Sequence, residues 1–223
     1  MNSCTLEEAL DRAYKTGNMP IEHAMIQKLK PYTMIHPVYL NVYLLLARQV
    51  SSLPGALVQC GCYMGGSAAA LRLALGPREV WLFDSFEGMP QPGYNDGKRA
   101  AWKYQMKGPG WHACSPDDVR AAFAVAEIPL DDVTIVQGWF QDTAPDAEVG
   151  PIAFLHLDAD WYASTKIPLE TFYDRVQPGG IVLIDDYGGW AGCKRAVNEF
   201  RTQRNISAEL KKATGSAFYW KVP

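Results

Sequence analysis

The sequence predicts an α/β fold built on a doubly wound, mostly parallel sheet. Short, apolar, β-prone runs alternate with helix-like segments from residue 56 to residue 202, as in sheets that carry helices on both faces. Two of these runs, 155–157 and 179–184, each lead into carboxylates. The stretch between them suits one strand–helix–strand crossover of about 30 residues. A glycine loop at 61–67 follows the apolar run at 56–60, and such folds often bind ligands at this loop.

The composition is that of one globular domain. The chain has 223 residues, of which 48% are hydrophobic and 20% are charged, and this suits a full-sized core. We expect a helical cap over residues 1–51 and an α/β core over 56–223, with a lid inserted at about 85–114. The net charge of −3 disfavours nucleic acid as a partner, because proteins that bind it usually carry a basic excess.

The N-terminal part predicts helices and no targeting signal. Residues 5–8 form a capping-box pattern for a short helix that ends near Gly17, and 21–29 and 38–51 are expected to be helices as well. The segment lacks a basic start and an apolar core, so we expect no signal peptide. The most apolar helical stretch, 38–47, is too short for a membrane span of about 20 residues. Five cysteines without framework spacing indicate free thiols and a cytoplasmic protein.

The remaining elements are predicted from hydrophobic periodicity and from the residues that begin and end helices and strands. Further strands are expected at 56–60, 79–83 and 133–136, with a closing antiparallel pair at 207–211 and 217–221. Further helices are expected at 68–75, 115–126 and 190–201. Residues 85–114 hold many Gly, Pro and aromatic residues with little periodicity, which usually marks a functional or disordered segment.

Carboxylates at the ends of the last two parallel strands predict a cation site. Asp158 ends one strand, and Asp185 and Asp186 end its neighbour, so all three are expected at one edge of the sheet. Three carboxylates repel one another unless a cation lies between them. Oxygen ligands favour Mg²⁺ or Mn²⁺ over zinc. The alternative is that each acid simply ends a strand or begins a helix.

The glycine loop and an acid on the next strand predict a nucleotide-type site. Gly61, Gly65 and Gly66 let the backbone approach a ligand closely, and the following helix start offers free N–H groups. Asp84 ends the second strand, where an acid typically binds a ribose diol. Together they favour an adenosine-containing cofactor over a tight turn with a surface Asp. No Walker loop is present, which disfavours ATP hydrolysis.

Six short runs carry a resemblance to a known family. They are Tyr32–Met34, Val58–Gly61, Gly65–Ser67, Phe83–Pro90, Leu157–Thr165 and Ile184–Tyr187. Over roughly residues 30–200 they resemble the macrocin O-methyltransferase family. The resemblance implies a class I, Rossmann-like methyltransferase fold, S-adenosylmethionine and Mg²⁺ (or Mn²⁺) as cofactors, and methylation of sugar hydroxyls on glycosylated natural products.

The resemblance also implies individual roles. The metal ligands would be Asp158, Asp185 and Asp186, and Asp158 would also contact the cofactor and act as the general base. The other cofactor contacts would be Thr33, Met34, Gln59, Gly61, Ser67, Asp84, Phe86, Gly138 and Gln141. The family usually has Glu where this chain has Gln59, which keeps an acceptor, adds a donor and loses a charge. The N-terminal segment looks short for the family, so we expect a more open acceptor pocket or changed subunit contacts.

Several assignments stay open at this stage. Asp160 returns to the same side as Asp158 along an extended strand end, so either could be the base. His112 is expected on the surface of the lid or against the acceptor, and His156 as a buried, hydrogen-bonded histidine. Two of the tryptophans at 102, 111, 139 and 161 are expected to line a pocket.

The predicted function is therefore a methyltransferase, with two alternatives. The main hypothesis is a Mg²⁺-dependent O-methyltransferase that acts on a sugar hydroxyl of a small, glycosylated acceptor. We expect the protein to form a homo-oligomer. A sugar hydroxyl is a poor acid and Asp is a weak base, so the metal must supply most of the activation. The alternatives are the same reaction on a catechol or phenol hydroxyl, and a nucleotide-binding module without catalysis.

Overall fold

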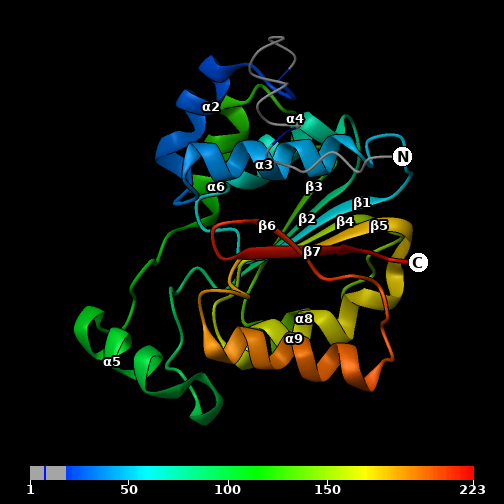
Figure 1. Ribbon diagram of the computed structural model, residues 1–223. Helices are drawn as coiled ribbons and strands as arrows, with labels where there is room; N and C mark the ends of the chain where they lie inside the picture. The colour runs from blue at the N-terminus through cyan, green and yellow to red at the C-terminus, as the bar shows by residue number, and fades with distance from the viewer. Residues whose placement is uncertain (1–7, 9–18) are drawn as a thin grey trace.

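A seven-stranded sheet forms the centre of the molecule (Figure 1). This is a computed structural model that describes residues 8 and 19–223. The strands lie in the order β3-β2-β1-β4-β5-β7-β6. Their bounds are β1 (Ala56–Cys60), β2 (Val80–Asp84), β3 (Val133–Gln137), β4 (Ile152–Leu157), β5 (Val176–Ile184), β6 (Lys211–Thr214) and β7 (Ala217–Lys221). Strands β1 to β5 pair in parallel, and β7 lies antiparallel between β5 and β6. This confirms the predicted doubly wound, mostly parallel sheet.

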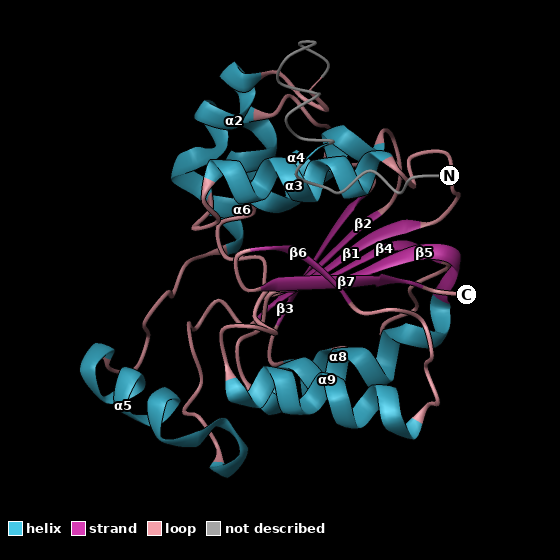
Figure 2. Ribbon diagram, in the orientation of Figure 1, coloured by secondary structure: helices cyan, strands magenta, loops and turns pink. Residues whose placement is uncertain are grey.

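Helices cover both faces of this sheet (Figure 2). On one face lie α2 (His23–Leu29), α3 (Pro37–Arg48), α4 (Gly66–Leu75) and α6 (Pro116–Val125). On the other lie α8 (Tyr162–Phe172) and α9 (Ala191–Gln203). Because strand side chains alternate between faces, Leu57 and Phe154 pack with the α3 and α4 layer, whereas Val58 and Leu155 pack with the α8 and α9 layer. The core is therefore split by the sheet into two parts.

Local signals explain where several helices begin. Helix α6 begins with the expected cap, in which Ser115 Oγ accepts the Asp118 N–H at 3.3 Å and Asp118 Oδ2 accepts the Ser115 N–H at 2.9 Å. Helix α3 begins at Pro37, with the His36 ring accepting the Val38 N–H. The predicted capping box at 5–8 and its helix lie outside the described residues, apart from the helical Glu8.

Short elements complete the connections. They are the 3₁₀ turns η1 (Lys30–Tyr32), η2 (Tyr94–Asp96) and η3 (Tyr173–Arg175) and the one-turn helix α7 (Phe140–Thr143). Among residues 8 and 19–223, no helix is both long enough and apolar enough to cross a membrane.

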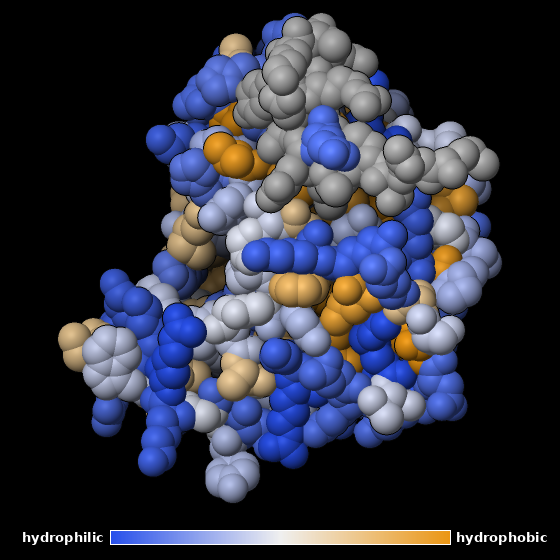
Figure 3. Space-filling view, in the orientation of Figure 1, coloured by the Kyte–Doolittle hydropathy of each residue, from blue (hydrophilic) through white to orange (hydrophobic). Residues whose placement is uncertain are grey.

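The lid segment is more regular than its sequence predicts. Residues 85–114 contain η2 and an 11-residue helix, α5 (Gly97–Lys107), which stands away from the helices that cover the sheet (Figure 1). Only Ala100 of α5 is buried, so the helix has no apolar stripe from which its period could be read. Figure 3 shows hydrophilic side chains over this part of the surface.

The closing pair is antiparallel as predicted, but β6 begins later than expected. The pattern at 207–211 overlaps the observed strand Lys211–Thr214 only at its last residue. The carbonyl of Ala208 accepts a hydrogen bond from the Arg201 guanidinium, so this part of the backbone is bonded to α9 instead of the sheet. A side chain from the preceding helix, seven residues earlier in the chain, thus binds the backbone that periodicity predicted to be a strand.

Candidate functional site

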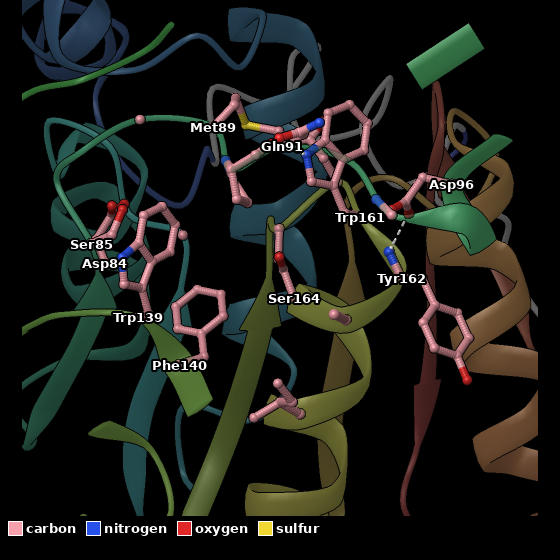
Figure 4. A pocket seen from close by; sticks show the side chains of 18 of the residues that line it. Asp84, Ser85, Met89, Gln91, Asp96, Trp139, Phe140, Trp161, Tyr162 and Ser164 are labelled. Carbon is pink, nitrogen blue, oxygen red and sulfur yellow. Dashed lines mark hydrogen bonds between the residues drawn. The ribbon is translucent and has the colours of Figure 1, made fainter. Parts of the chain in front are cut away.

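A cleft of about 650 Å³ opens at the carboxyl ends of β1, β2 and β4. The lid lies over it, and the loops after β3 and β4 form its walls (Figure 4). A volume in this range suits a cofactor or small substrate. The residues that line it and that the sequence had placed at the cofactor site are Met34, Gly61, Asp84, Gly138, Gln141 and Asp158.

The glycine loop passes directly beside the strand that carries Asp158. Gly61 has a φ of +80°, and a Cβ at this position would lie 1.8 Å from the Asp158 carbonyl oxygen. The backbone is held in place from both neighbours, because the Gly61 N–H bonds the Phe83 carbonyl at 2.9 Å and the Asp158 N–H bonds the Cys60 carbonyl at 3.0 Å. Only glycine fits this crossing.

Asp84 holds the same loop from the neighbouring strand. Its Oδ2 accepts the N–H groups of Cys62 and Tyr63, each at 2.9 Å, and its Oδ1 accepts the Phe86 N–H at 2.8 Å. Each carboxylate oxygen can accept more than one hydrogen bond. Asp84 can therefore support the loop and still face a ligand in the cleft.

Four of the predicted cofactor residues lie outside the lining of the cleft. They are Thr33, Gln59, Ser67 and Phe86. Gln59 Nε2 donates to the Gly61 carbonyl at 3.1 Å and to Ser67 Oγ at 2.9 Å, so these two side chains support the glycine loop from behind. Phe86 is 5% exposed and belongs to the core on the α3 side.

The strand-end carboxylates point to both sides of the sheet edge. Neighbouring residues of an extended strand face opposite sides, and Asp185 and Asp186 follow this rule. Ligand atoms of Asp158, Asp160 and Asp186 lie within 4.8 Å of one another, and so do those of His156, Asp158 and Asp185. In the described part of the chain, the acids thus fall into two groups that share Asp158. The alternation that predicts this split could have been read from the sequence.

Burial raises the pKa of each of these carboxyl groups. Desolvation, followed by the charges of Asp185 and Asp186, holds the pKa of Asp158 well above its usual value. Desolvation also raises the pKa of Asp160 to about 6, and raises the pKa of Asp185 and that of Asp186. The charged forms are costly in this arrangement, and a bound cation would offset that cost.

Helix α3 reaches this cluster through Tyr43, a residue to which the sequence assigned no role in the site. Tyr43 is 2% exposed, and its hydroxyl donates a hydrogen bond to Oδ1 of Asp185. Its ring also meets the His156 ring edge-on, with the ring centroids 5.5 Å apart. No local pattern marks such a contact, because it joins residues that are far apart in the chain.

Tyr43→Phe is expected to lower the free energy of unfolding by about 2 kcal/mol, because the buried carboxyl group of Asp185 loses its donor. Urea unfolding of both proteins measures this difference. Tyr94→Phe is the matched control, since Tyr94 is 99% exposed and should change stability by less than about 0.5 kcal/mol. Equal effects of the two substitutions would contradict the assigned hydrogen bond.

Two side-chain contacts tie the lid to the loop after β4, and the sequence predicted neither contact. Asp96, at 5% exposure, accepts the Tyr162 N–H at 2.6 Å and the Gly93 N–H at 2.7 Å, and Figure 4 draws the first of these bonds. Trp161 Nε1 donates to the Pro90 carbonyl at 2.9 Å. The Gly-x-x-Asp spacing of 93–96 is typical of a local side-chain turn and was the available signal.

Asp96→Ala is expected to loosen the lid, because the first N–H of α8 and the Gly93 N–H lose a charged acceptor. The loss of about 1.5 kcal/mol or more should raise the rate of tryptic cleavage within 97–107 about tenfold. Limited proteolysis followed by mass spectrometry gives this rate. The exposed Asp131→Ala serves as control, and identical cleavage of both variants would show that Asp96 does not hold the lid.

Two predicted pocket tryptophans line the cleft. Trp139 and Trp161 are in its wall together with Phe140 (Figure 4), which agrees with the expectation for two of the four. Trp102 is 60% exposed. His112 also lines the cleft, at a positive φ of 68°. Burial and then the charges of nearby lysines lower the pKa of its ring.

His156 corrects one prediction. It is fully buried as expected, but neither ring nitrogen has a hydrogen-bond partner among the residues described here. The prediction was therefore right that His156 is buried and wrong that its ring is hydrogen-bonded. The residue lies two positions before Asp158, on β4, and one ring nitrogen lies within 4.8 Å of carboxylate oxygens of Asp158 and Asp185.

Solved structures share this architecture. The O-methyltransferase NovP superposes with a TM-score of 0.78 at 32% sequence identity, over 86% of this chain and 82% of NovP. The calicheamicin methyltransferase CalS11 superposes with a TM-score of 0.66 at 23% identity, over 99% of this chain and 94% of CalS11. The second likeness supports the fold alone.

Sequence comparisons identify the family. Residues 27–222 match the model of the macrocin-O-methyltransferase (TylF) family. The 8-demethyl-8-(2,3-dimethoxy-alpha-L-rhamnosyl)-tetracenomycin-C 4'-O-methyltransferase of Streptomyces olivaceus is 37% identical over 75% of this chain and 66% of that protein. The demethyldecarbamoylnovobiocin O-methyltransferase of Streptomyces niveus is 34% identical over 77% and 67%, respectively. The chain thus spans about two thirds of the length of these relatives. It belongs to the macrocin O-methyltransferase family.

Proposed function

We propose that this chain is an S-adenosylmethionine-dependent, divalent-cation-dependent O-methyltransferase that methylates a sugar hydroxyl of a glycosylated natural product. The observation that carries the proposal is the meeting of the glycine loop, Asp84 and Asp158 in one cleft. Relatives at 33–37% identity support the acceptor class, because their names specify O-methylation of a rhamnosyl-tetracenomycin, a novobiocin precursor and mycinamicin III.

The lining of the cleft fits S-adenosylmethionine. Bare backbone at Gly61 and Gly138 allows close approach, and both have positive φ. Asp84 is proposed to hold the ribose, and the aromatic walls at 139–140 the adenine. Met34, which lines the cleft from the N-terminal part of the chain, would cover the cofactor. When bound, the cofactor supplies the methyl group for an in-line displacement.

The donor set fits a hard divalent cation such as Mg²⁺ or Mn²⁺. Asp158, Asp185 and Asp186 are the proposed ligands. Asp158 has ligand atoms within 4.8 Å of those of Asp185 in one group and of those of Asp186 in the other. The buried carboxyl groups have raised pKa values that opposite charge would offset. When bound, the cation supplies activation of the acceptor hydroxyl by making it more acidic.

The protein groups position the acceptor and take its proton. Asp158 and Asp160 both line the cleft, and one of them is proposed to accept the hydroxyl proton. Trp161 and the lid exclude water from the reacting atoms, which strengthens the electrostatic interactions within the cleft. His112 is proposed to contact the acceptor from the lid side.

The assembly and compartment are further parts of the proposal. A homo-oligomer is proposed, with the exposed side chains of Val38 and Tyr39 on α3, at 45% and 42% exposure, in the contact between subunits. Free thiols at Cys60, Cys62 and Cys193 are buried, which suits a reducing cytoplasm.

A binding and transfer assay tests the function. S-adenosylhomocysteine should raise the melting temperature, and methyl-labelled S-adenosylmethionine with Mg²⁺ should label a glycoside from a panel of macrolide, aminocoumarin and tetracenomycin substrates. Labelling of catechols in preference to glycosides would show that the acceptor is a catechol instead of a glycoside. Absence of any stabilisation by S-adenosylhomocysteine, with or without Mg²⁺, would overturn the proposal.

A further inference from the structure

His156 is a buried polar side chain that the proposed reaction does not use. It is 0% exposed, and neither ring nitrogen has a partner among the described residues. Leaving a buried polar group unsatisfied costs about 1–3 kcal/mol, so a side chain in this state points to a ligand.

The position of His156 shows which ligand it could meet. It lies on the same face of β4 as Asp158, two residues along the strand, and one ring nitrogen lies within 4.8 Å of carboxylate oxygens of Asp158 and Asp185. These three atoms are close enough to share one ion. His156 and Asp185 do not line the cleft, so the group lies below its floor, on the side of α3.

We propose that His156, Asp158 and Asp185 form a cation subsite with a nitrogen ligand, selective for a first-row transition metal ion such as Mn²⁺, Fe²⁺ or Co²⁺ over Mg²⁺. An imidazole nitrogen is a better ligand for transition-metal ions such as Fe²⁺ than for Mg²⁺, which strongly favours oxygen ligands. The subsite shares Asp158 and Asp185 with the proposed Mg²⁺ ligands and adds a nitrogen ligand to them. It differs from the all-oxygen group of Asp158, Asp160 and Asp186, with which it shares only Asp158. It rests on the proposed function only in requiring a divalent-cation centre at Asp158.

The three side chains also carry a suitable charge for a divalent ion. A metal ligand needs a free lone pair on nitrogen, so the ring would bind in its neutral form. The two carboxylates then supply the negative charge that a divalent ion requires.

Neighbouring side chains can orient the ligands. Tyr43 donates to Oδ1 of Asp185 and so fixes one oxygen of that carboxylate. Gln59 pairs in register with His156 on the adjacent strand, and its Oε1 is buried without a hydrogen-bond partner in the described part of the chain. The Gln59 amide oxygen is therefore available to accept a hydrogen bond from the second ring nitrogen of His156. Hydrogen bonds of this kind commonly fix the orientation of a metal-bound histidine ring. A neutral Gln, in place of a Glu, adds no further charge to the site.

Pulsed electron paramagnetic resonance of the Mn²⁺-loaded protein tests the inference without an activity assay. Nitrogen nuclei directly bound to Mn²⁺ modulate the electron spin echo. We expect ¹⁴N modulation in the full chain, replaced by the ¹⁵N pattern when only the histidines are labelled with ¹⁵N. This labelling leaves the sequence unchanged, so the result does not depend on whether a variant folds.

Two variants then assign the nitrogen. His156→Gln should remove the modulation and weaken Mn²⁺ binding at least about tenfold with little change for Mg²⁺, whereas the exposed His23→Gln should retain it. Bound Mn²⁺ without nitrogen modulation would overturn the role of His156 and leave the proposed function intact. Failure to bind any Mn²⁺ would overturn both this subsite and the proposed cation centre, while cofactor binding would remain separately measurable.

Discussion

Asp158→Asn should reduce kcat/KM for methyl transfer at least about 10³-fold, a loss typical of removing a positioned acid–base group or metal ligand. Asp158 belongs to both groups of closely spaced ligand atoms and also lines the cleft, so no neighbour can replace it in both places. Formation of S-adenosylhomocysteine over time measures the effect. Stability should not fall, because the raised pKa of Asp158 shows that its charge is unfavourable in the folded chain.

Two further Asp→Asn variants make this experiment specific. Asp117, whose side chain is 89% exposed, is the matched control and should leave turnover unchanged. Asp160→Asn separates the two candidate bases: if it lowers turnover as much as Asp158→Asn while cation affinity stays at the wild-type value, Asp160 takes the proton. Turnover within tenfold of wild type in Asp158→Asn would contradict the proposed centre.

Gly61→Ala is expected to destabilise the chain by about 4 kcal/mol or more and to abolish binding of S-adenosylhomocysteine. The new Cβ would lie 1.8 Å from the Asp158 carbonyl, so either the loop or the end of β4 must move. Such a shift adds to the cost of about 1–3 kcal/mol for a strained positive φ. Chemical denaturation gives the stability, and calorimetric titration gives the affinity.

Gly76→Ala separates the clash from the backbone strain. Gly76 has a φ of +81°, close to that of Gly61, but nothing lies within 4 Å of its Cβ position. Its substitution should cost about 2 kcal/mol by strain alone and leave ligand affinity unchanged. If both variants lose the same stability and Gly61→Ala still binds ligand, the close crossing with Asp158 does not govern the site.

The parallel core was predictable because its signals are local. Buried strands such as 56–60 are nearly continuous apolar runs, and the cap at Ser115 needs only neighbouring residues. The lid helix α5 was not predictable in the same way, since it buries only Ala100. A helix that contributes so little to a core carries little hydrophobic periodicity.

The candidate site was predictable in its acids and not in their partners. The sequence predicted that Asp158 would come near Asp185 and Asp186, because parallel strands end at one edge of a sheet. It did not reveal the hydrogen bond from Tyr43, which crosses from α3 to β5. Nor did it reveal that Asp96 accepts the first N–H of α8. Both contacts depend on how distant segments pack.

The divergence of Asp185 and Asp186 has a mechanical consequence for unfolding. Asp185 accepts a hydrogen bond from Tyr43 in the α3 layer, and Asp186 accepts one from the Asp160 N–H on the side of the α8 layer. Ions bound to Asp158 on both sides would therefore link the two halves of the core to each other. With chelator present, amide exchange should report separate opening of these halves. With a divalent ion bound, they should open as one cooperative unit.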